Sequence, residues 1–273
     1  MTYITTNDGV QLYLKDWGQG RPVVMAHGWP LSADTFDDLS MAVAEAGMRA
    51  ISYDRRGFGR SEQPWDGYDY DTLADDLSSV LEKTAAEDAT LLGFSMGGGE
   101  VARYMSRHKG NWVKQAILVS SVVPYMLKTG DNPGGVAQSV FDEMTQAMKE
   151  DRAEFWSEFF KDFFGVGALD HPVTSEVIEW ARSMSMQAGL RPTLACAKAF
   201  ATTDFRGDLS AFSVPTLIIH GTADKIVPID ASARQAARGI PLAELIEYEG
   251  APHGLFASHK DRLIADVMKF LAS

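Results

Sequence analysis

The sequence predicts an α/β fold, with a mostly parallel β-sheet flanked by helices and interrupted by a helical insertion. Short apolar runs alternate with amphipathic helical patterns over residues 1–121 and again over 214–273. The stretch between them, 122–213, carries helical patterns alone. In addition, one serine stands in a glycine-rich turn between an apolar run and a helical pattern. Together these observations indicate an enzyme-like core with a separate helical segment inserted into it.

The chain is expected to open with an antiparallel hairpin at one edge of the sheet. Two runs, 3–6 and 10–17, flank the tight-turn sequence Asn7-Asp8-Gly9. Strands and helices then alternate, which implies right-handed crossovers between parallel strands. The expected strands are 22–26, 49–53, 90–94 and 113–120, and the expected helices are 35–46, 72–85 and 98–107.

After the insertion the alternation resumes, with strands expected at 215–220 and 243–248 and helices at 231–238 and 261–271. We therefore divide the chain into a core, 1–121 and 214–273, and a cap, 122–213. An insertion that follows a strand whose carboxyl end faces a site lies over that site. Large apolar residues of the cap, such as Trp156 and Phe163, are expected to form mainly the cap's own core, with a minority contacting substrate.

Composition excludes several classes of function. The chain has 37 acidic and 25 basic residues, and its net charge of −12 disfavours nucleic acid and anionic membranes as partners. The single cysteine, Cys196, lies in an apolar helical pattern and is expected to be a buried core residue. Scattered histidines and one cysteine provide no metal-ligand spacing, so we expect neither a metal nor a cofactor. The N-terminus lacks a signal-peptide pattern and no apolar run is long enough to span a membrane, so a cytoplasmic protein is expected.

The most informative segment is Gly93-Phe94-Ser95-Met96-Gly97-Gly98. A serine in a sharp strand-to-helix turn projects its hydroxyl away from the sheet, and the turn needs small residues two positions before and after the serine. Gly93 and Gly97 meet this requirement. The helix that follows directs its first N–H groups toward the point where negative charge develops during acyl transfer. Ser95 is therefore the predicted nucleophile.

A serine nucleophile needs a base, and the base needs an acid that orients it. In this architecture the order along the chain is serine, acid, histidine, each after a strand. Asp224 follows the strand 215–220, and His253 follows the last strand in Ala251-Pro252-His253-Gly254. We predict Asp224 as the acid and His253 as the base. His108, His171 and His259 are expected to be solvated, whereas His27 and His220, which end strands, are expected to be buried and to form hydrogen bonds that shape the loops after them.

An oxyanion hole should combine the N–H of the residue after the nucleophile with one from a loop after an earlier strand. Met96 supplies the first N–H, and the loop of Gly28, Trp29 and Pro30 points to the N–H of Trp29 as the second. Pro30 stiffens this loop and influences where the Trp29 carbonyl points. A carbonyl turned into the site would accept a hydrogen bond from hydrogen peroxide, which predicts perhydrolysis beside hydrolysis. The alternative is that Pro30 serves only to stiffen the loop.

The chain resembles the cofactor-free bacterial haloperoxidase and arylesterase group of the α/β-hydrolase superfamily nearly from end to end. The resemblance rests on these motifs: Lys15-Asp16-Trp17-Gly18, His27-Gly28-Trp29-Pro30, Tyr53-Asp54-Arg55-Arg56-Gly57-Phe58-Gly59-Arg60-Ser61, Gly93-Phe94-Ser95-Met96-Gly97-Gly98-Gly99-Glu100, Thr203-Asp204-Phe205-Arg206 and Ala251-Pro252-His253-Gly254. It implies an eight-stranded sheet, a helical cap, a triad of Ser95, Asp224 and His253, and an oxyanion hole from Trp29 and Met96. It also implies that Arg55 and Arg56 belong to a structural loop and do not bind an anion.

The resemblance further implies a serine esterase for small acyl and aryl esters that makes peracids from carboxylic acids and hydrogen peroxide, and it implies self-association into dimers or rings. A lactonase, a γ-lactamase or a C–C bond hydrolase would use the same triad with a different cap pocket. A receptor built on this fold without turnover is a more remote alternative. A haloalkane dehalogenase is excluded, because displacing halide would need an aspartate at the position of Ser95.

Overall fold

In a computed structural model that describes residues 2–273, one eight-stranded sheet carries the order β1-β2-β4-β3-β5-β6-β7-β8. The strands are β1 (Thr2–Thr5), β2 (Gln11–Gly18), β3 (Pro22–Ala26), β4 (Arg49–Tyr53), β5 (Ala89–Phe94), β6 (Val113–Val119), β7 (Thr216–Gly221) and β8 (Ala243–Tyr248). The pairs β1–β2 and β2–β4 are antiparallel and all other neighbours are parallel. The predicted edge hairpin and the mostly parallel sheet are both confirmed.

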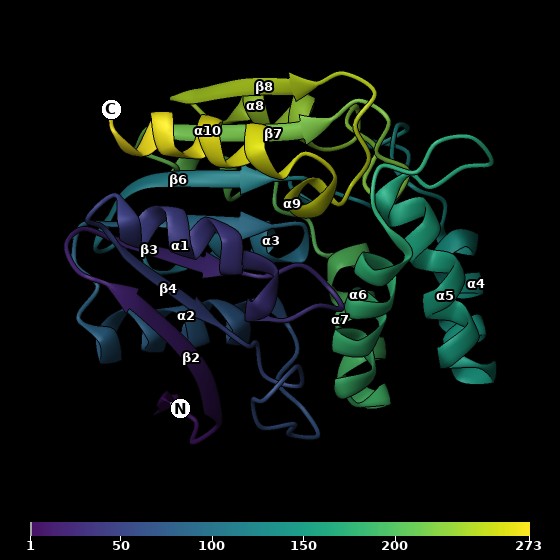
Figure 1. The fold of residues 1–273 in the computed structure, drawn as a ribbon, viewed down its shortest axis with the longest axis horizontal. Helices are drawn as coiled ribbons and strands as arrows, with labels where there is room; N and C mark the ends of the chain where they lie inside the picture. The colour runs from purple at the N-terminus through teal and green to yellow at the C-terminus, as the bar shows by residue number, and fades with distance from the viewer. Residues whose placement is uncertain (1) are drawn as a thin grey trace.

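Helices cover both faces of the sheet (Figure 1). On the face toward the viewer lie α1 (Asp37–Glu45) and α10 (Lys260–Leu271), which contact each other. Behind the sheet lie α2 (Tyr70–Thr84), α3 (Met96–Arg107) and α8 (Ala233–Gly239). The central strands β3, β5 and β7 are buried along their whole length, as expected for strands covered on both faces.

The segment 122–213 contains four α-helices, α4 (Gln138–Glu150), α5 (Arg152–Phe164), α6 (Ser175–Gln187) and α7 (Leu190–Thr202). Figure 1 shows them beyond the arrowheads of the parallel strands, at the carboxyl edge of the sheet. Two of these helices begin at side-chain caps: the Asp151 side chain accepts hydrogen bonds from N–H groups in the first turn of α5, and the Thr174 side chain does so for α6. Buried aromatic side chains of α5, such as Trp156 and Phe160, pack against each other, and Trp156 also contacts Trp29 of the core.

Three short elements were not predicted. The 3-10 helices η1 (Ala33–Phe36) and η2 (Leu209–Ala211) and the one-turn helix α9 (Leu255–Ser258) have too few residues to show a helical period. The helix α3 also begins two residues earlier than expected, directly after Ser95. As a result, the first backbone N–H groups of α3 lie beside the serine.

Candidate active site

Ser95 occupies a strained backbone position between β5 and α3. Its φ of 54° and ψ of −117° lie outside the regions that side-chain-bearing residues favour. The conformation is held by hydrogen bonds from its N–H to the Val119 carbonyl (2.9 Å) and from the Gly98 N–H to its own carbonyl (3.0 Å). A non-glycine residue two positions away would disrupt this turn, since a Cβ at Gly93 would come within 2.5 Å of the Gly97 carbonyl oxygen.

The three predicted triad residues come together although they lie far apart in the sequence. His253 Nε2 lies 3.0 Å from Ser95 Oγ, and His253 Nδ1 lies 2.7 Å from Asp224 Oδ2. Each side chain follows a different strand, β5 for the serine, β7 for the acid and β8 for the histidine. His253 and Asp224 are buried, and Ser95 is 5% exposed. The relay from hydroxyl to imidazole to carboxylate is thus continuous and shielded from bulk water.

Asp224 is held as a carboxylate by four groups. Its Oδ1 accepts hydrogen bonds from the N–H groups of Ile226 (2.9 Å) and Val227 (2.8 Å). Its Oδ2 lies 2.7 Å from His253 Nδ1 and 3.1 Å from His220 Nε2. Burial opposes ionisation, but the two histidines outweigh burial and keep the pKa of Asp224 well below its usual range. The ionised acid therefore fixes the tautomer in which His253 Nε2 can accept the serine proton.

His220 makes a contact that the sequence did not reveal. It is fully buried at the end of β7, where its Nε2 lies 2.8 Å from the Val227 carbonyl as well as near Asp224. The carbonyl requires that Nε2 carry a proton, which can be shared with Asp224 Oδ2. Its Nδ1 has no partner within residues 2–273. The predicted role as a buried hydrogen-bonding residue is confirmed, and the contact with the acid is new.

The two backbone N–H groups predicted to form the oxyanion hole have no hydrogen-bond acceptor in the described part of the chain. Within residues 2–273, neither the N–H of Met96 nor that of Trp29 donates to another protein group. Met96 is the first residue of α3, so the positive end of that helix adds to the local potential. The Trp29–Pro30 peptide bond is cis. The Gly28 segment packs directly on the serine turn, since a Cβ at Gly28 would come within 3.1 Å of Ser95 Cβ.

The Trp29 side chain joins the core loop to the cap helices. Its Nε1 donates to the Thr193 carbonyl at the start of α7 (3.0 Å). Its ring packs edge to face against Trp156, Phe159 and Phe200, with centroids 5.0, 5.6 and 5.3 Å away. The predicted loop is therefore held by cap aromatics and is surrounded by apolar surface.

Two further aromatic rings contact the imidazole of His253. Phe163 at the end of α5 meets it edge to face at 4.8 Å, and Phe94 lies against it at 5.4 Å. Neither contact was predicted, because the sequence shows that these residues are apolar but not which neighbour they face. The two rings limit the orientations of His253 and exclude water from one side of it.

The other motifs serve the fold. Arg55 and Arg56 are buried, and each pairs with an acidic side chain, Glu100 for the first and Asp76 for the second. This confirms that the arginine loop is structural. Cys196 is fully buried, and burial raises the pKa of its thiol to about 12, so it is an unreactive core residue as expected.

Four histidines remain. His27 is fully buried after β3, and its Nε2 accepts a hydrogen bond from the Arg55 N–H (2.9 Å), as expected of a buried hydrogen-bonding residue. His171 is exposed. The expectation of a solvated His108 is wrong, because its Nε2 pairs with Asp75 (2.8 Å) and its ring stacks on Tyr104. His259 is also partly buried, at the start of α10.

Residues 2–273 contain no cluster of three or more His, Cys, Asp or Glu side chains arranged to hold a metal ion. Within the same residues, the helices are all too short or too polar to cross a membrane.

Comparison with known proteins gives a consistent result. A family model described as the α/β hydrolase fold matches residues 21–260. The chain is 44% identical to the non-heme chloroperoxidase CPO-A1 of Kitasatospora aureofaciens over 273 residues, covering 99% of each chain. It is 38% identical to the bifunctional esterase/perhydrolase DCH of Acinetobacter calcoaceticus over 280 residues, covering 100% of each. A crystal structure of a bromoperoxidase from Bacillus anthracis superimposes with a TM-score of 0.95 at 38% identity, with 100% of both chains covered.

Proposed function

The chain belongs to the α/β-hydrolase family, and from this premise we propose that it is a serine carboxylic-ester hydrolase for small acyl and aryl esters that also has perhydrolase activity. The observation that carries the proposal is the unbroken relay from Ser95 Oγ through His253 to Asp224, next to two unpaired N–H groups. Full-length relatives named as non-heme chloroperoxidase and as esterase/perhydrolase support the same activity.

In the acylation step, Ser95 Oγ attacks the ester carbonyl carbon while His253 Nε2 takes the hydroxyl proton. The N–H groups of Met96 and Trp29 receive the carbonyl oxygen as it becomes negative. The tetrahedral intermediate then collapses, the bond to the alcohol oxygen breaks, and His253 returns the proton to the leaving alcohol. Asp224 stabilises the imidazolium that exists between the two proton transfers.

In the deacylation step, a small protic nucleophile attacks the acyl-enzyme and gives its proton to His253. Water releases a carboxylic acid, and hydrogen peroxide releases a peracid. Both reactions restore the Ser95 hydroxyl. The near-complete enclosure of Ser95, together with the aromatic rings around Trp29, favours small apolar acyl groups.

The proposal also assigns a role to Pro30. This residue orients the Trp29 carbonyl so that the carbonyl oxygen accepts a hydrogen bond from hydrogen peroxide. A Pro30→Leu variant should lower the ratio of peracid formation to ester hydrolysis. An unchanged ratio in that variant would restrict Pro30 to stiffening the loop.

The proposal is tested by assaying wild type and Ser95→Ala on p-nitrophenyl esters of increasing acyl length, with and without hydrogen peroxide and bromide. Removing the nucleophile should lower kcat by about 10⁶. Ser139→Ala, at an exposed position on α4, is the matched control and should retain full activity. Bromination in acetate buffer should depend on Ser95 in the same way, because the peracid forms from the acyl-enzyme.

Absence of ester turnover in wild type would refute the esterase assignment and redirect the search to lactones, lactams or C–C bonds that the same triad can cleave. Bromination that survives in Ser95→Ala would refute the perhydrolase mechanism. We also propose that the protein is cytoplasmic and that it associates with copies of itself. Analytical ultracentrifugation of the purified protein tests the latter.

A further inference from the structure

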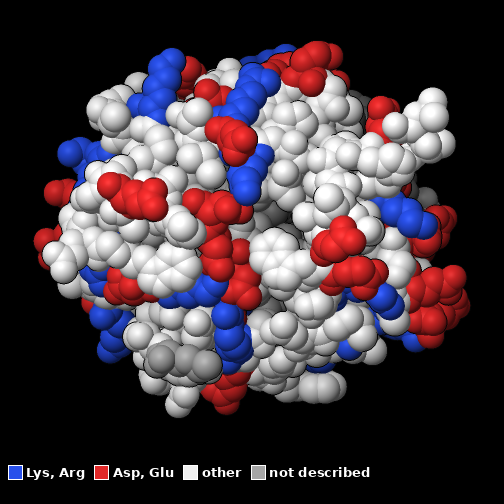
Figure 2. Space-filling model, in the orientation of Figure 1, with Lys and Arg blue, Asp and Glu red and all other residues white. Residues whose placement is uncertain are grey.

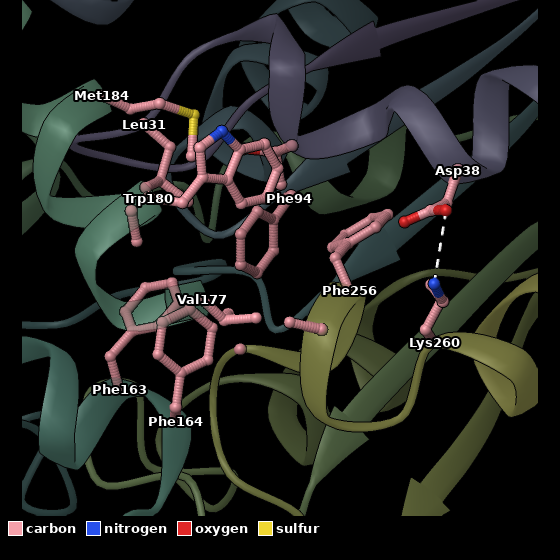
Figure 3. A pocket seen from close by; sticks show the side chains of 14 residues that line it. Leu31, Asp38, Phe94, Phe163, Phe164, Val177, Trp180, Met184, Phe256 and Lys260 are labelled. Atoms are coloured by element: carbon pink, nitrogen blue, oxygen red, sulfur yellow. Dashed lines mark hydrogen bonds and ion pairs between the residues drawn. The ribbon is translucent and has the colours of Figure 1, made fainter. Parts of the chain in front are cut away.

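A cavity of about 140 Å³ lies between the cap and the core, apart from the catalytic relay. Its walls come from the loop after β3 (Leu31), from β5 (Phe94), from the end of α5 (Phe163), from α6 (Trp180) and from α9 (Phe256). None of the three triad side chains lines it. Figure 3 shows the labelled aromatic rings around this space, and Figure 2 shows a hollow on the face where α1, α6 and α9 meet.

The cavity has the size of one aromatic ring. Apolar cavities of about 150 Å³ lined by aliphatic and aromatic side chains bind benzene. Here rings from four separate elements provide both faces and edges for offset or edge-to-face contacts. A long acyl chain or a fused ring system would extend beyond this volume toward solvent.

The polar side chains at the cavity indicate which polar group and which charge a ligand would carry. Thr35 is one of the lining residues, and its Oγ1 is buried without a hydrogen-bond partner within residues 2–273, so a rotation about χ1 is needed to turn this hydroxyl into the space. Such a hydroxyl favours a ligand that brings one donor or acceptor of its own. The charged residues in the wall, Asp38 and Lys260, pair with each other at 3.3 Å, so neither sign of charge is favoured (Figure 3).

We propose that this cavity binds a phenol, a neutral single-ring aromatic molecule that carries one hydroxyl group. The ring packs against Phe94 and Phe163, and the hydroxyl forms a hydrogen bond with Thr35.

The position of the cavity links it to the active site. Phe94 and Phe163 form part of its wall, and the same two rings contact the imidazole of His253. A phenol in the cavity therefore packs on the wall that orients His253 and leaves the space at Ser95 free. An aryl ester would release a phenol on hydrolysis, so the ligand belongs to the class of the expected product. That link rests on the proposed function, whereas the binding itself does not.

The test measures binding of phenol and toluene to the wild-type protein by isothermal titration calorimetry and by ¹H–¹⁵N chemical-shift mapping. The two probes have similar shape and differ by the hydroxyl. Phenol should bind with 1:1 stoichiometry and a dissociation constant of about 1 mM or tighter. The largest shifts should fall on α6 and α9, which line the cavity.

Two variants separate the parts of the proposal. Thr35→Val keeps the side-chain shape and should weaken phenol about fivefold while leaving toluene unchanged. Val177→Phe, at a half-buried position in the cavity wall, should fill the space and remove binding of both probes. The matched control is Val140→Phe on the exposed face of α4, which should bind both probes like wild type.

Unsaturable binding of phenol, or binding that Val177→Phe leaves intact, would overturn the proposal. An equal loss of phenol and toluene in Thr35→Val would overturn the hydroxyl contact. These measurements involve no ester turnover, so their failure is separable from that of the proposed esterase activity.

Discussion

Two buried polar clusters lie near each other in this molecule and differ in how fully their groups are paired. The catalytic cluster consists of Ser95, His253, Asp224 and His220. The arginine cluster consists of Tyr53, Arg55, Arg56, Asp76 and Glu100. Both are almost inaccessible to solvent, and both include residues that follow strands of the sheet.

In the arginine cluster every charge is opposed. Glu100 accepts a hydrogen bond from Tyr53 (2.6 Å) and pairs with Arg55, and Arg56 Nε donates to Asp76 (2.6 Å). In the catalytic cluster the acid is fully satisfied, but two N–H groups near the serine are free and the serine backbone is strained. The difference teaches that burial and charge do not distinguish the two clusters, whereas free N–H groups beside a strained serine do.

Among variants that keep the serine nucleophile, the largest effect is expected from Asp224→Asn. The amide removes the charge that holds His253 in the reactive tautomer, so kcat should fall by about 10⁴. Steady-state kinetics on a p-nitrophenyl ester measure the loss, and circular dichroism checks that the variant is folded. A fall of less than tenfold would mean that another group supplies the acid.

A change in the arginine cluster should lower stability more than activity. Glu100→Gln leaves Arg55 buried without a counter-charge, which costs about 3–5 kcal/mol and lowers Tm by about 10 °C. At 25 °C the folded fraction should lose far less activity than Asp224→Asn does. Tyr53→Phe is the matched control, since it removes one hydrogen bond and leaves the charges paired. A Glu100→Gln variant that keeps its Tm but loses activity would contradict the view that the arginine cluster serves stability and not catalysis.

Substitutions of His220 test whether this residue influences catalysis through Asp224. His220→Leu removes an N–H near Asp224 Oδ2, so the pKa of Asp224 should rise toward its ordinary value. The acid limb of the pH–rate profile reports protonation of the imidazole base, and a carboxylate with one donor fewer holds the imidazolium of His253 more strongly. This limb should therefore move upward by about one pH unit, with kcat lowered about tenfold. His220→Gln keeps a donor and should restore most of both values. A profile that does not move would show that His220 only packs.

The smallest effect is expected at the exposed rim of the arginine cluster. The Arg56 side chain lowers the pKa of Asp8 to about 2, so this carboxylate stabilises the fold above pH 4 and the contribution disappears as pH falls toward 2. Asp8→Asn should lower Tm by about 1–3 °C at pH 7. The difference from wild type should vanish near pH 2. Asp170→Asn, at an exposed position, is the control, and a difference that persists in acid would contradict the ion-pair account.

Local patterns in the sequence were sufficient to predict most of the fold. The strands, the edge hairpin and the helical nature of 122–213 follow from periodicity and from turn signals such as Asn7-Asp8-Gly9. The one-turn helix α9 and the earlier start of α3 were missed because they depend on loop geometry around His253 and Ser95. No period of hydrophobicity reports such short elements.

The candidate site was predictable where chemistry fixes residue type and order along the chain. Ser95, Asp224 and His253 could be chosen because an activated serine requires a base and an acid, each after a strand. The contacts of His220 with the acid and of Phe94 with the imidazole could not, because they depend on side-chain directions set by tertiary packing. The cavity beside Phe94 has no signature in the sequence for the same reason.

The central claim is that the free N–H groups and the strained serine backbone of the catalytic cluster make Ser95 Oγ the reactive atom of this protein. It is tested most directly by treating the enzyme with diethyl p-nitrophenyl phosphate and locating the diethylphosphoryl group by peptide mass spectrometry. We predict one label per chain, on Ser95, in proportion to the loss of esterase activity, and slower labelling in Asp224→Asn. Complete inactivation with the label on another residue, or with Ser95 unmodified, would contradict the claim.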